Sequence, residues 1–161
     1  RLDQSSTYKA IQELQMFMEY FPDSDKKTEA QLMIFNLQDK LVLKDYLSAK
    51  LYYDLGTYNG NASQTADGRI NGNNYLACIT TAENALKDYP YTSMREEISI
   101  LVLRAKYRLG TESVEEKKEE RMREAIDEYY AFKNEFPESK YIKEVESIYK
   151  DASKYVKELN D

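Results

Sequence analysis

The three prolines of this chain constrain its fold more than any other feature, because all three lie in one repeated local pattern. Pro22, Pro90 and Pro137 each follow an aromatic residue, and each stands two positions before a serine or threonine. A residue that precedes proline is disfavoured in the helical conformation, so each pattern ends a helix. The hydroxyl residue that follows can cap the next helix. The pattern therefore predicts successive helices joined by similar turns.

The residues upstream of the prolines align as well, which indicates an internal repeat. Twelve positions before each proline the chain has a small residue, which allows two helices to approach closely. Five positions before it the chain has alanine or phenylalanine, and an aromatic ring there fills the gap near the helix end. The two sets are Ala10, Cys78 and Ala125, and then Phe17, Ala85 and Phe132.

A second repeated element ends in a glycine. The segment 53–57 (YDLGT) is similar to the segment 107–111 (YRLGT), so that Gly56 and Gly110 each follow a helical run. We expect both glycines to adopt the left-handed conformation that ends a helix. The stretch from Gly56 to Pro90 is longer than the stretch from Gly110 to Pro137, so the two units differ in their internal connection.

Hydrophobic periodicity predicts about seven helices and no convincing strand. The expected ranges are about 7–20, 26–43, 44–55, 74–88, 94–109, a helix that ends at 136, and 141–159, with the third helix either separate from the second or continuous with it. Capping boxes are expected at Ser93 and Ser113. The scarcity of Gly and Pro agrees with long helices.

These helices predict an all-α fold, a tetratricopeptide-like α-α superhelix of stacked antiparallel helix hairpins. The helix at 44–55 is expected to pair with 74–88, and the helix at 94–109 with the one that ends at 136. Residues 1–161 would form a single domain, and the family resemblance described below implies that it is the C-terminal part of a longer chain.

Two connections have an unusual composition. Residues 59–73 are rich in Gly, Asn and Ser, which favours a flexible surface loop, with a partner-contacting insertion as the alternative. Residues 112–124 are dense in Glu, Lys and Arg. That composition predicts a solvated helical extension with ion pairs of mixed sign, with a role in an interaction as the alternative.

The composition argues against catalysis and against metal or cofactor binding. The chain has no histidine, and Cys78 is its only cysteine, so we expect a buried structural thiol there and no disulfide within the chain. Adjacent carboxylates such as Glu96 and Glu97 diverge into water on a helix surface. We therefore expect no catalytic, cofactor-binding or metal-binding residue, and no enzyme activity.

The charge and hydropathy of the chain limit its partners. A net charge of −6 without an evident basic patch makes nucleic acid a poor partner. No apolar run approaches the length that spans a membrane.

The tyrosines carry the clearest signal for binding another protein. The helices at 44–55 and 94–109 are the first members of their hairpins, and such helices line the concave face of a stacked array, where extended partners bind. Tyrosine suits an interface because it offers a large contact area at a low entropic cost. The candidate partner-binding residues are Tyr46, Tyr52, Tyr53 and Tyr107. The alternative is that these rings fill the core between hairpins.

The proline-ended helices, the small residues and the Leu-Gly turns resemble tetratricopeptide repeats, although Phe17 and Phe132 stand where that repeat favours alanine. The stretch Leu37–Gly56 is similar to the middle of the outer-membrane assembly lipoprotein family BamD, and 84–97 continues the similarity. The loop at 59–73 and the charged extension are similar to the version found in Bacteroides-type bacteria.

This resemblance implies a non-catalytic scaffold of the β-barrel assembly machinery at the periplasmic face of the outer membrane. The implied partners are the barrel subunit BamA, on whose periplasmic domains the family docks, and unfolded outer-membrane proteins. Membrane attachment would run only through a lipidated N-terminal cysteine upstream of Arg1, which is not Cys78. Family members can carry an arginine for the BamA contact where this chain has Thr81, so no specific contact is carried over. A generic tetratricopeptide adaptor for secretion or nutrient uptake is the alternative.

Overall fold

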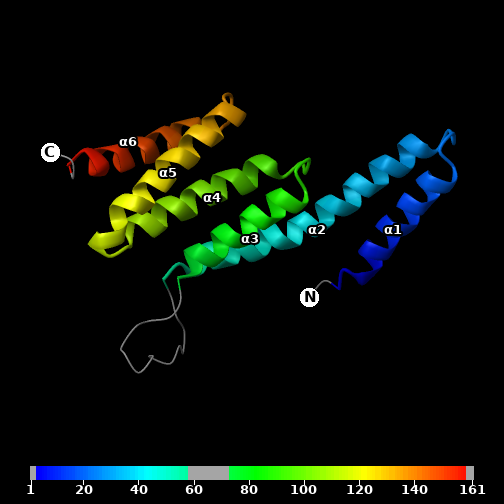
Figure 1. Ribbon diagram of the computed structural model, residues 1–161, viewed down its shortest axis with the longest axis horizontal. Helices are drawn as coiled ribbons and strands as arrows, with labels where there is room; N and C mark the ends of the chain where they lie inside the picture. The colour runs from blue at the N-terminus through cyan, green and yellow to red at the C-terminus, as the bar shows by residue number, and fades with distance from the viewer. Residues whose placement is uncertain (1–2, 58–72, 159–161) are drawn as a thin grey trace, which may run out of the picture.

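The computed structural model describes residues 3–57 and 73–158, and this part of the chain is helical throughout apart from turns (Figure 1). Its helices are α1 (Ser5–Tyr20), α2 (Lys27–Leu55), α3 (Asn74–Asp88), α4 (Arg95–Thr111), α5 (Glu115–Glu135) and α6 (Ile142–Glu158). No strand occurs among the described residues, so the expected all-α fold is confirmed. The loop expected at 59–73 lies outside the described residues except for Asn73, which caps the start of α3.

The described part holds six helices where the sequence predicts about seven. The segments 26–43 and 44–55 form one continuous helix, α2, of 29 residues. Neither Gly nor Pro interrupts this stretch, and Leu43 and Lys44 at the expected boundary both favour a helix. The alternative of a direct continuation is therefore the correct one.

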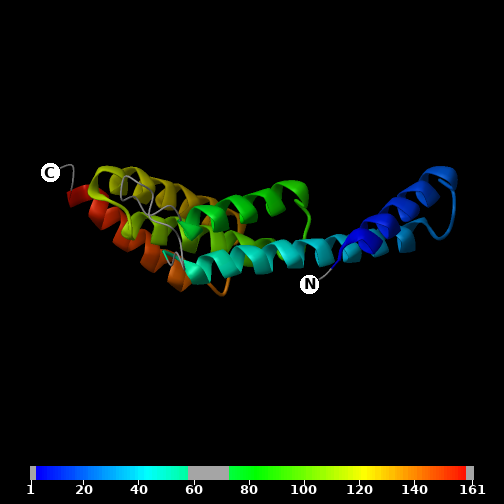
Figure 2. The ribbon, with the colours of Figure 1, turned by 90° about the horizontal axis from the view of Figure 1, so that it is seen from below.

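Consecutive helices pack against each other in two layers. The contacts run from α1 to α2 and onward to α6, so the predicted pairing of α2 with α3 and of α4 with α5 is confirmed. Figure 2 shows α2, α4 and α6 in one layer and α3 and α5 in the other. Within the described residues α2 contacts α4 and α4 contacts α6, whereas α3 and α5 do not meet. The layer of α2, α4 and α6 is therefore the inner side of the curved stack, and its surface is called the inner face below.

The three proline turns share one geometry. The residues before the prolines have φ and ψ of −127° and 64° at Phe21, −130° and 68° at Tyr89, and −128° and 62° at Phe136. The backbone N–H of each donates to the carbonyl four residues earlier, at 3.0, 3.0 and 2.8 Å. The repeat inferred from the prolines is therefore present in the structure as three superimposable turns.

The hydroxyl residue after each proline stabilises the turn and not the helix start. The side-chain oxygens of Ser24, Thr92 and Ser139 accept from the N–H two residues further on, at 3.2, 3.2 and 3.0 Å. Each of these bonds closes before the first residue of the following helix. The hydroxyls thus set the angle at which one helix follows another.

The two expected capping boxes are wrong. The residues that directly precede α4 and α5 are Met94 and Val114, and neither makes a side-chain cap bond. Ser93 Oγ donates instead to Asp39 Oδ2 of α2 at 2.6 Å, and Ser113 Oγ donates to the carbonyl of Leu109. A tertiary contact of Ser93 and a local contact of Ser113 with the end of α4 thus replace the expected caps.

The two glycines have different roles. Gly56 ends α2 with a positive φ of 52°, as predicted, but its ψ of −117° lies outside the left-handed helical region that was expected. The prediction for Gly110 is wrong, because α4 continues through it to Thr111 with no positive φ there. A Cβ at Gly110 would lie 3.0 Å from Met122 Sδ, so this glycine allows α4 and α5 to approach each other.

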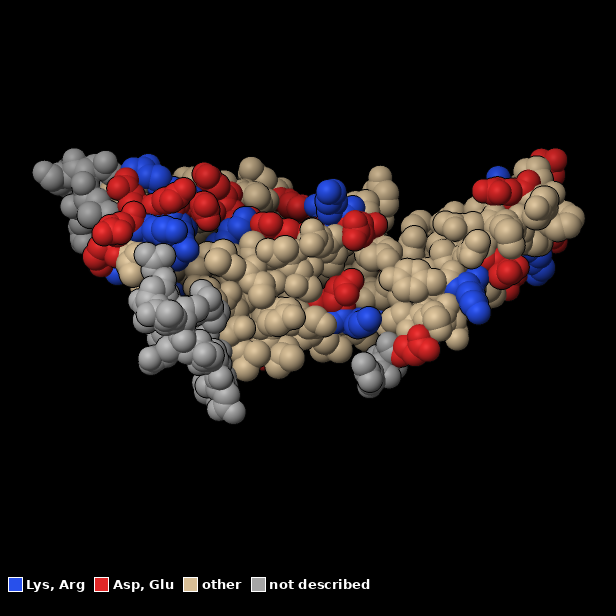
Figure 3. Space-filling model, turned by 60° about the horizontal axis from the view of Figure 1, so that its bottom comes forward, with Lys and Arg blue, Asp and Glu red and all other residues tan. Residues whose placement is uncertain are grey.

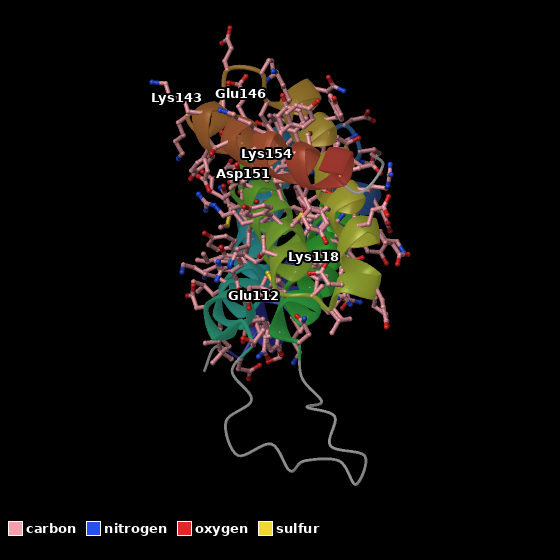
Figure 4. The ribbon with its side chains drawn as sticks, turned by 90° about the vertical axis from the view of Figure 1, so that its left-hand side faces the viewer. Glu112, Lys118, Lys143, Glu146, Asp151 and Lys154 are labelled. Carbon is pink, nitrogen blue, oxygen red and sulfur yellow. The ribbon has the colours of Figure 1, made fainter. Side chains whose placement is uncertain are left out.

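Buried side chains form three clusters that follow the chain. One joins α1 to α2, one joins α2, α3 and α4, and one joins α4, α5 and α6. Because α4 contributes to two clusters, it is the most deeply buried helix of the stack. On α6, Val145, Ile148 and Ala152 are buried while the opposite side is charged, as expected of a helix at the edge of a stack. Figure 4 labels four of these charged residues, Lys143, Glu146, Asp151 and Lys154.

The charged segment at 112–124 forms the start of α5. Its side chains are mostly exposed, and Lys118 pairs with Glu115 at 3.1 Å and Arg123 with Glu119 at 2.6 Å. These spacings of three and four residues are the mixed-sign pairs expected of a solvated helix. The structural part of that prediction is confirmed.

Cys78 is fully buried between α2, α3 and α4, and burial raises the pKa of its thiol to about 12. At pH 8 the reactive thiolate is then rare, so a thiol reagent reaches Cys78 only when the fold opens. We expect labelling by a coloured disulfide reagent to be at least about 100-fold slower in the native chain than in 8 M urea. Rapid stoichiometric labelling of the native chain would contradict this placement.

Candidate functional site

The structure places the four candidate tyrosines in different surroundings. Tyr46 and Tyr53 lie seven residues apart on one side of α2, and both are partly buried against the cluster of α2, α3 and α4. Tyr107 packs in the same way against the cluster of α4, α5 and α6. Tyr52 is 36% exposed and, as the neighbour of Tyr53 in a helix, projects from another side of α2. Tyr46 and Tyr53 therefore share one side of α2, whereas Tyr52 lies on another.

Arg104 lies at the centre of the inner face and joins α4 to α6. Its Nε donates to Glu144 Oε1 at 2.6 Å and its Nη2 donates to Glu144 Oε2 at 2.7 Å. Its guanidinium carbon also lies 5.2 Å from the centre of the Tyr141 ring. These hydrogen bonds lower the pKa of the Glu144 carboxyl and raise the pKa of Arg104. The planar cation is held in one orientation while its edge remains partly exposed.

Tyr53 of α2 lies within electrostatic range of the same cation. Its pKa is raised, chiefly because the ring is partly buried, while the positive charges of Arg108 and Arg104 oppose that rise. Its ring meets the ring of Tyr75 edge to face, with centres 5.7 Å apart. Tyr53 therefore lies between the aromatic core of the stack and the guanidinium groups of the inner face.

A short polar network continues from Tyr75 to the end of α4. The Tyr75 hydroxyl donates to Glu112 Oε1 at 3.1 Å and accepts from Arg108 Nε at 3.3 Å. Arg108 and Glu112 form an ion pair at 2.7 Å, and Figure 4 labels Glu112. The network ties α3 to the C-terminal end of α4 and positions Arg108 beside Tyr53.

The edges of the inner face carry further charges. Lys50 pairs with Asp54 on α2 at 2.7 Å, and both side chains are about half exposed. At the other edge Lys140 lies 3.6 Å from Glu97 and 4.8 Å from the centre of the Tyr141 ring. The inner face thus presents cations, carboxylates and aromatic rings from α2, α4 and the start of α6, which we call the inner-face cluster. Its members are Lys50, Tyr53, Arg104, Arg108, Tyr141 and Glu144.

Sequence reasoning identified Tyr53 but missed the charged members of this cluster. Lys50 and Arg104 each stand six residues before the glycine of their unit, just as Tyr53 and Tyr107 each stand three before it. Extending the glycine-based alignment by three residues upstream would have found both cations. No comparable signal exists for Glu144, because α6 has no glycine of this kind.

The remaining surface is uneven in charge. On the face that Figure 3 presents, charged side chains gather over the end that holds α5 and α6, and the middle of the molecule is largely uncharged. Leu43, Leu47 and Leu51 of α2 and Leu76 of α3 are among the exposed apolar residues. Within residues 3–57 and 73–158, no helix is long and apolar enough to cross a membrane, and no three His, Cys, Asp or Glu residues gather as a metal site would need.

The ion pair between Arg104 and Glu144 gives the stability of the chain a defined pH dependence. Because the pKa of Glu144 is lowered in the folded state, its contribution is complete above about pH 4.5 and is lost as the pH falls through the folded value. We expect Glu144→Gln to reduce the free energy of unfolding by only about 0.5 kcal/mol at pH 7, because both side chains of the pair are partly exposed. The loss should be smaller at pH 3, where Glu144 is more often protonated. Urea unfolding at the two pH values measures this, and an equal loss at both would contradict it.

No known protein family matches this chain, and no curated protein sequence is significantly similar to it.

Proposed function

We propose that this chain is a non-catalytic protein-binding scaffold of the outer-membrane β-barrel assembly complex, which docks on the periplasmic domains of a BamA-like subunit. In that setting it works at the periplasmic face of the outer membrane, with unfolded outer-membrane proteins as further partners and with a lipid anchor supplied from outside the described residues. The proposal is supported by the similarity of Leu37–Gly56 to the BamD family and by the tetratricopeptide-like stacking of helix pairs.

The inner-face cluster is the observation that carries the protein-binding role. Arg104 is fixed by two hydrogen bonds and stays partly exposed, the Tyr141 ring just before α6 lies against its guanidinium, and Tyr53 of α2 is within its electrostatic range. Arginine and tyrosine are the residue types that most often dominate the energy of protein interfaces. A surface with fixed cations and rings can hold the carboxylates and backbone carbonyls of an extended or folded polypeptide at a low entropic cost.

A generic tetratricopeptide adaptor for secretion or nutrient uptake is the second candidate. Thr81, on α3, favours it, because BamD-type proteins can carry an arginine for the BamA contact at that position. The stacked fold and the inner-face cluster support either function, so the partner distinguishes them.

A calorimetric titration with the purified periplasmic region of the BamA-like subunit from the same organism tests the first proposal. We expect a dissociation constant in the micromolar range or lower, and a loss of about tenfold in affinity for the double variant Lys50→Gln, Arg108→Gln. The matched control is the double variant Lys143→Gln, Arg123→Gln, which removes the same charge from exposed positions of α5 and α6. Absence of binding at 100 µM chain, about a hundredfold above the expected constant, would reject the BamA-type partner.

A further inference from the structure

Helix α2 is longer than its counterpart α4, and the difference has a structural consequence. Helix α2 has 29 residues, whereas α4 has 17 residues. The difference lengthens α2 by about three turns, or about 18 Å. The N-terminal half of α2 therefore matches α4 when the two are aligned on Pro22 and Pro90, and the C-terminal half matches α4 when they are aligned on Gly56 and Gly110.

In the complete hairpin, α5 covers one side of α4. Ile100 and Leu103 of α4 are 1% and 0% exposed, and they pack with Tyr129 and Phe132 of α5. Ile100 stands ten residues after Pro90 and Leu103 stands thirteen residues after it. These two positions therefore mark the side of the first helix that the second helix of its hairpin covers, here together with α6.

The same positions are uncovered on the N-terminal half of α2. Leu32 and Phe35 stand ten and thirteen residues after Pro22, and they are 59% and 43% exposed. Helix α3 packs instead on the C-terminal half, where Val42 and Ala49 are fully buried with it. In the part of the chain that the structure describes, no helix lies where α5 would lie by analogy. The N-terminal half of α2 thus presents a hairpin surface without its second helix.

Phe35 on this uncovered side lines a groove of about 730 Å³, whereas Leu32 lies outside the groove lining. Ile34 and Phe35 of α2 line its floor, Met18 of α1 lines one wall, and the turn at 88–92 between α3 and α4 closes the other. Figure 2 shows α1 and the end of α3 standing apart above α2, and Figure 3 shows the surface hollowed between them. The groove is wide because α3 packs on the C-terminal half of α2, away from α1.

The rim of the groove is acidic. Glu19, Asp39 and Asp88 line it, against one lysine, Lys27. Asp39 Oδ1 accepts from Thr92 Oγ1 at 2.6 Å, so this carboxylate is fixed at the boundary of α2 and the turn. An occupant with basic residues along its edges therefore fits the charge of the groove better than an acidic one.

We propose, as a deepening of the scaffold function proposed above, that this groove receives one amphipathic α-helix of a partner protein with lysine or arginine at its edges. The helix lies against Phe35 on the uncovered side of α2, as α5 lies against α4. The inward side of α5 carries Met122, Ala125, Tyr129 and Phe132, all buried. The partner helix is therefore expected to be about four turns long, with apolar residues at that spacing and a small residue at the second position.

Fluorescence anisotropy with a designed peptide tests this inference on the full chain. The probe is a labelled peptide of residues 117–135 in which the outward residues Glu120, Glu124 and Asp127 are changed to lysine, so that it keeps the inward pattern of α5 and is basic. We expect binding with a dissociation constant of about 10–100 µM, and a loss of about tenfold or more with Phe35→Glu. The matched control is Leu51→Glu, an exposed apolar residue on the C-terminal half of α2, which should change the affinity by less than about twofold.

Three results would overturn the groove assignment. A scrambled peptide of the same composition could bind with the same affinity, or the Phe35→Glu variant could bind the peptide as tightly as the unchanged chain does. The chain could also self-associate through this groove and exclude the peptide, which would make a second copy the occupant. The two proposals fail separately. If the chain binds the peptide but not the BamA-like region, only the proposed partner is rejected. If the chain binds the BamA-like region but not the peptide, and Phe35→Glu does not change the binding of that region, only the groove is rejected.

Discussion

Phe132→Ala is expected to lower the free energy of unfolding by about 3–5 kcal/mol, which is a large part of the stability of a domain of this size. Phe132 is 1% exposed and belongs to the cluster that joins α4, α5 and α6. Its ring lies 5.1 Å from the ring of Phe136 at the end of α5. The substitution removes the side chain around which three helices pack and leaves a cavity that a helical stack cannot easily close. Urea unfolding followed by circular dichroism measures the loss.

Phe17→Ala is the matched control, because Phe17 occupies the same repeat position on α1. Its ring pairs with Phe21 at 5.5 Å, much as Phe132 pairs with Phe136. Phe17 is only partly buried, however, since no helix in the described part of the chain covers that side of α1. We expect a loss of less than about 2 kcal/mol, in proportion to the smaller apolar area that it buries. Equal losses for the two variants would show that α1 is as fully covered as α5.

Gly56→Ala is expected to destabilise the chain by about 2–4 kcal/mol. The backbone at Gly56 has φ of 52° and ψ of −117°, which an alanine adopts only with strain of about 1 kcal/mol or more. The added Cβ would also lie 2.7 Å from the Tyr75 hydroxyl, and that hydroxyl is held by Glu112 and Arg108. Both the turn after α2 and the polar network must shift, which adds about 1–3 kcal/mol.

Gly110→Ala separates these causes. Gly110 lies inside α4 without a positive φ, and an added Cβ would meet the flexible end of the Met122 side chain at 3.0 Å. The gain of about 1 kcal/mol from replacing glycine in a helix offsets the cost of moving that methionine. We expect a net change within about 1 kcal/mol of zero by the same unfolding measurement. A loss as large as that of Gly56→Ala would mean that the contact between α4 and α5 is as rigid as the turn after α2.

The helices and their turns could be predicted from the sequence because their signals are local. A proline after an aromatic residue acts on the backbone at that point, and all three prolines produce the same turn. The pairing of α2 with α3 and of α4 with α5 followed from that repeat. The solvated, charged start of α5 could also be predicted, because the residues of its ion pairs lie three or four positions apart in the sequence.

The predictions that failed did so because of contacts between residues that lie far apart along the chain. Asp39 lies 54 residues from Ser93 along the chain, and their hydrogen bond overrides a capping box that fits local rules. Gly110 has the sequence of a helix end, but its close approach to Met122 on α5 decides its role. The continuity of α2 through Leu43 removed one predicted helix, and the groove beside Phe35 exists only because of that continuity.

The candidate site was predictable in composition but not in geometry. The sequence placed Tyr46, Tyr53 and Tyr107 on the first helices of the hairpins, and the structure has them there, partly buried. How far each ring is covered depends on neighbours such as Tyr75 and Arg104, which belong to other helices. Arg104 could therefore be identified as the central cation only from the structure, in which α4 and α6 lie side by side.

Site-specific photo-crosslinking tests most directly whether the inner face binds a polypeptide. A photoreactive phenylalanine analogue replaces Lys50 or Arg108 on the inner face, or Arg123 or Lys143 as controls on exposed positions of α5 and α6. The chain is then irradiated with the periplasmic region of the BamA-like subunit. The account predicts crosslinks from positions 50 and 108 and none from positions 123 and 143. Crosslinks confined to positions 123 and 143 would contradict it.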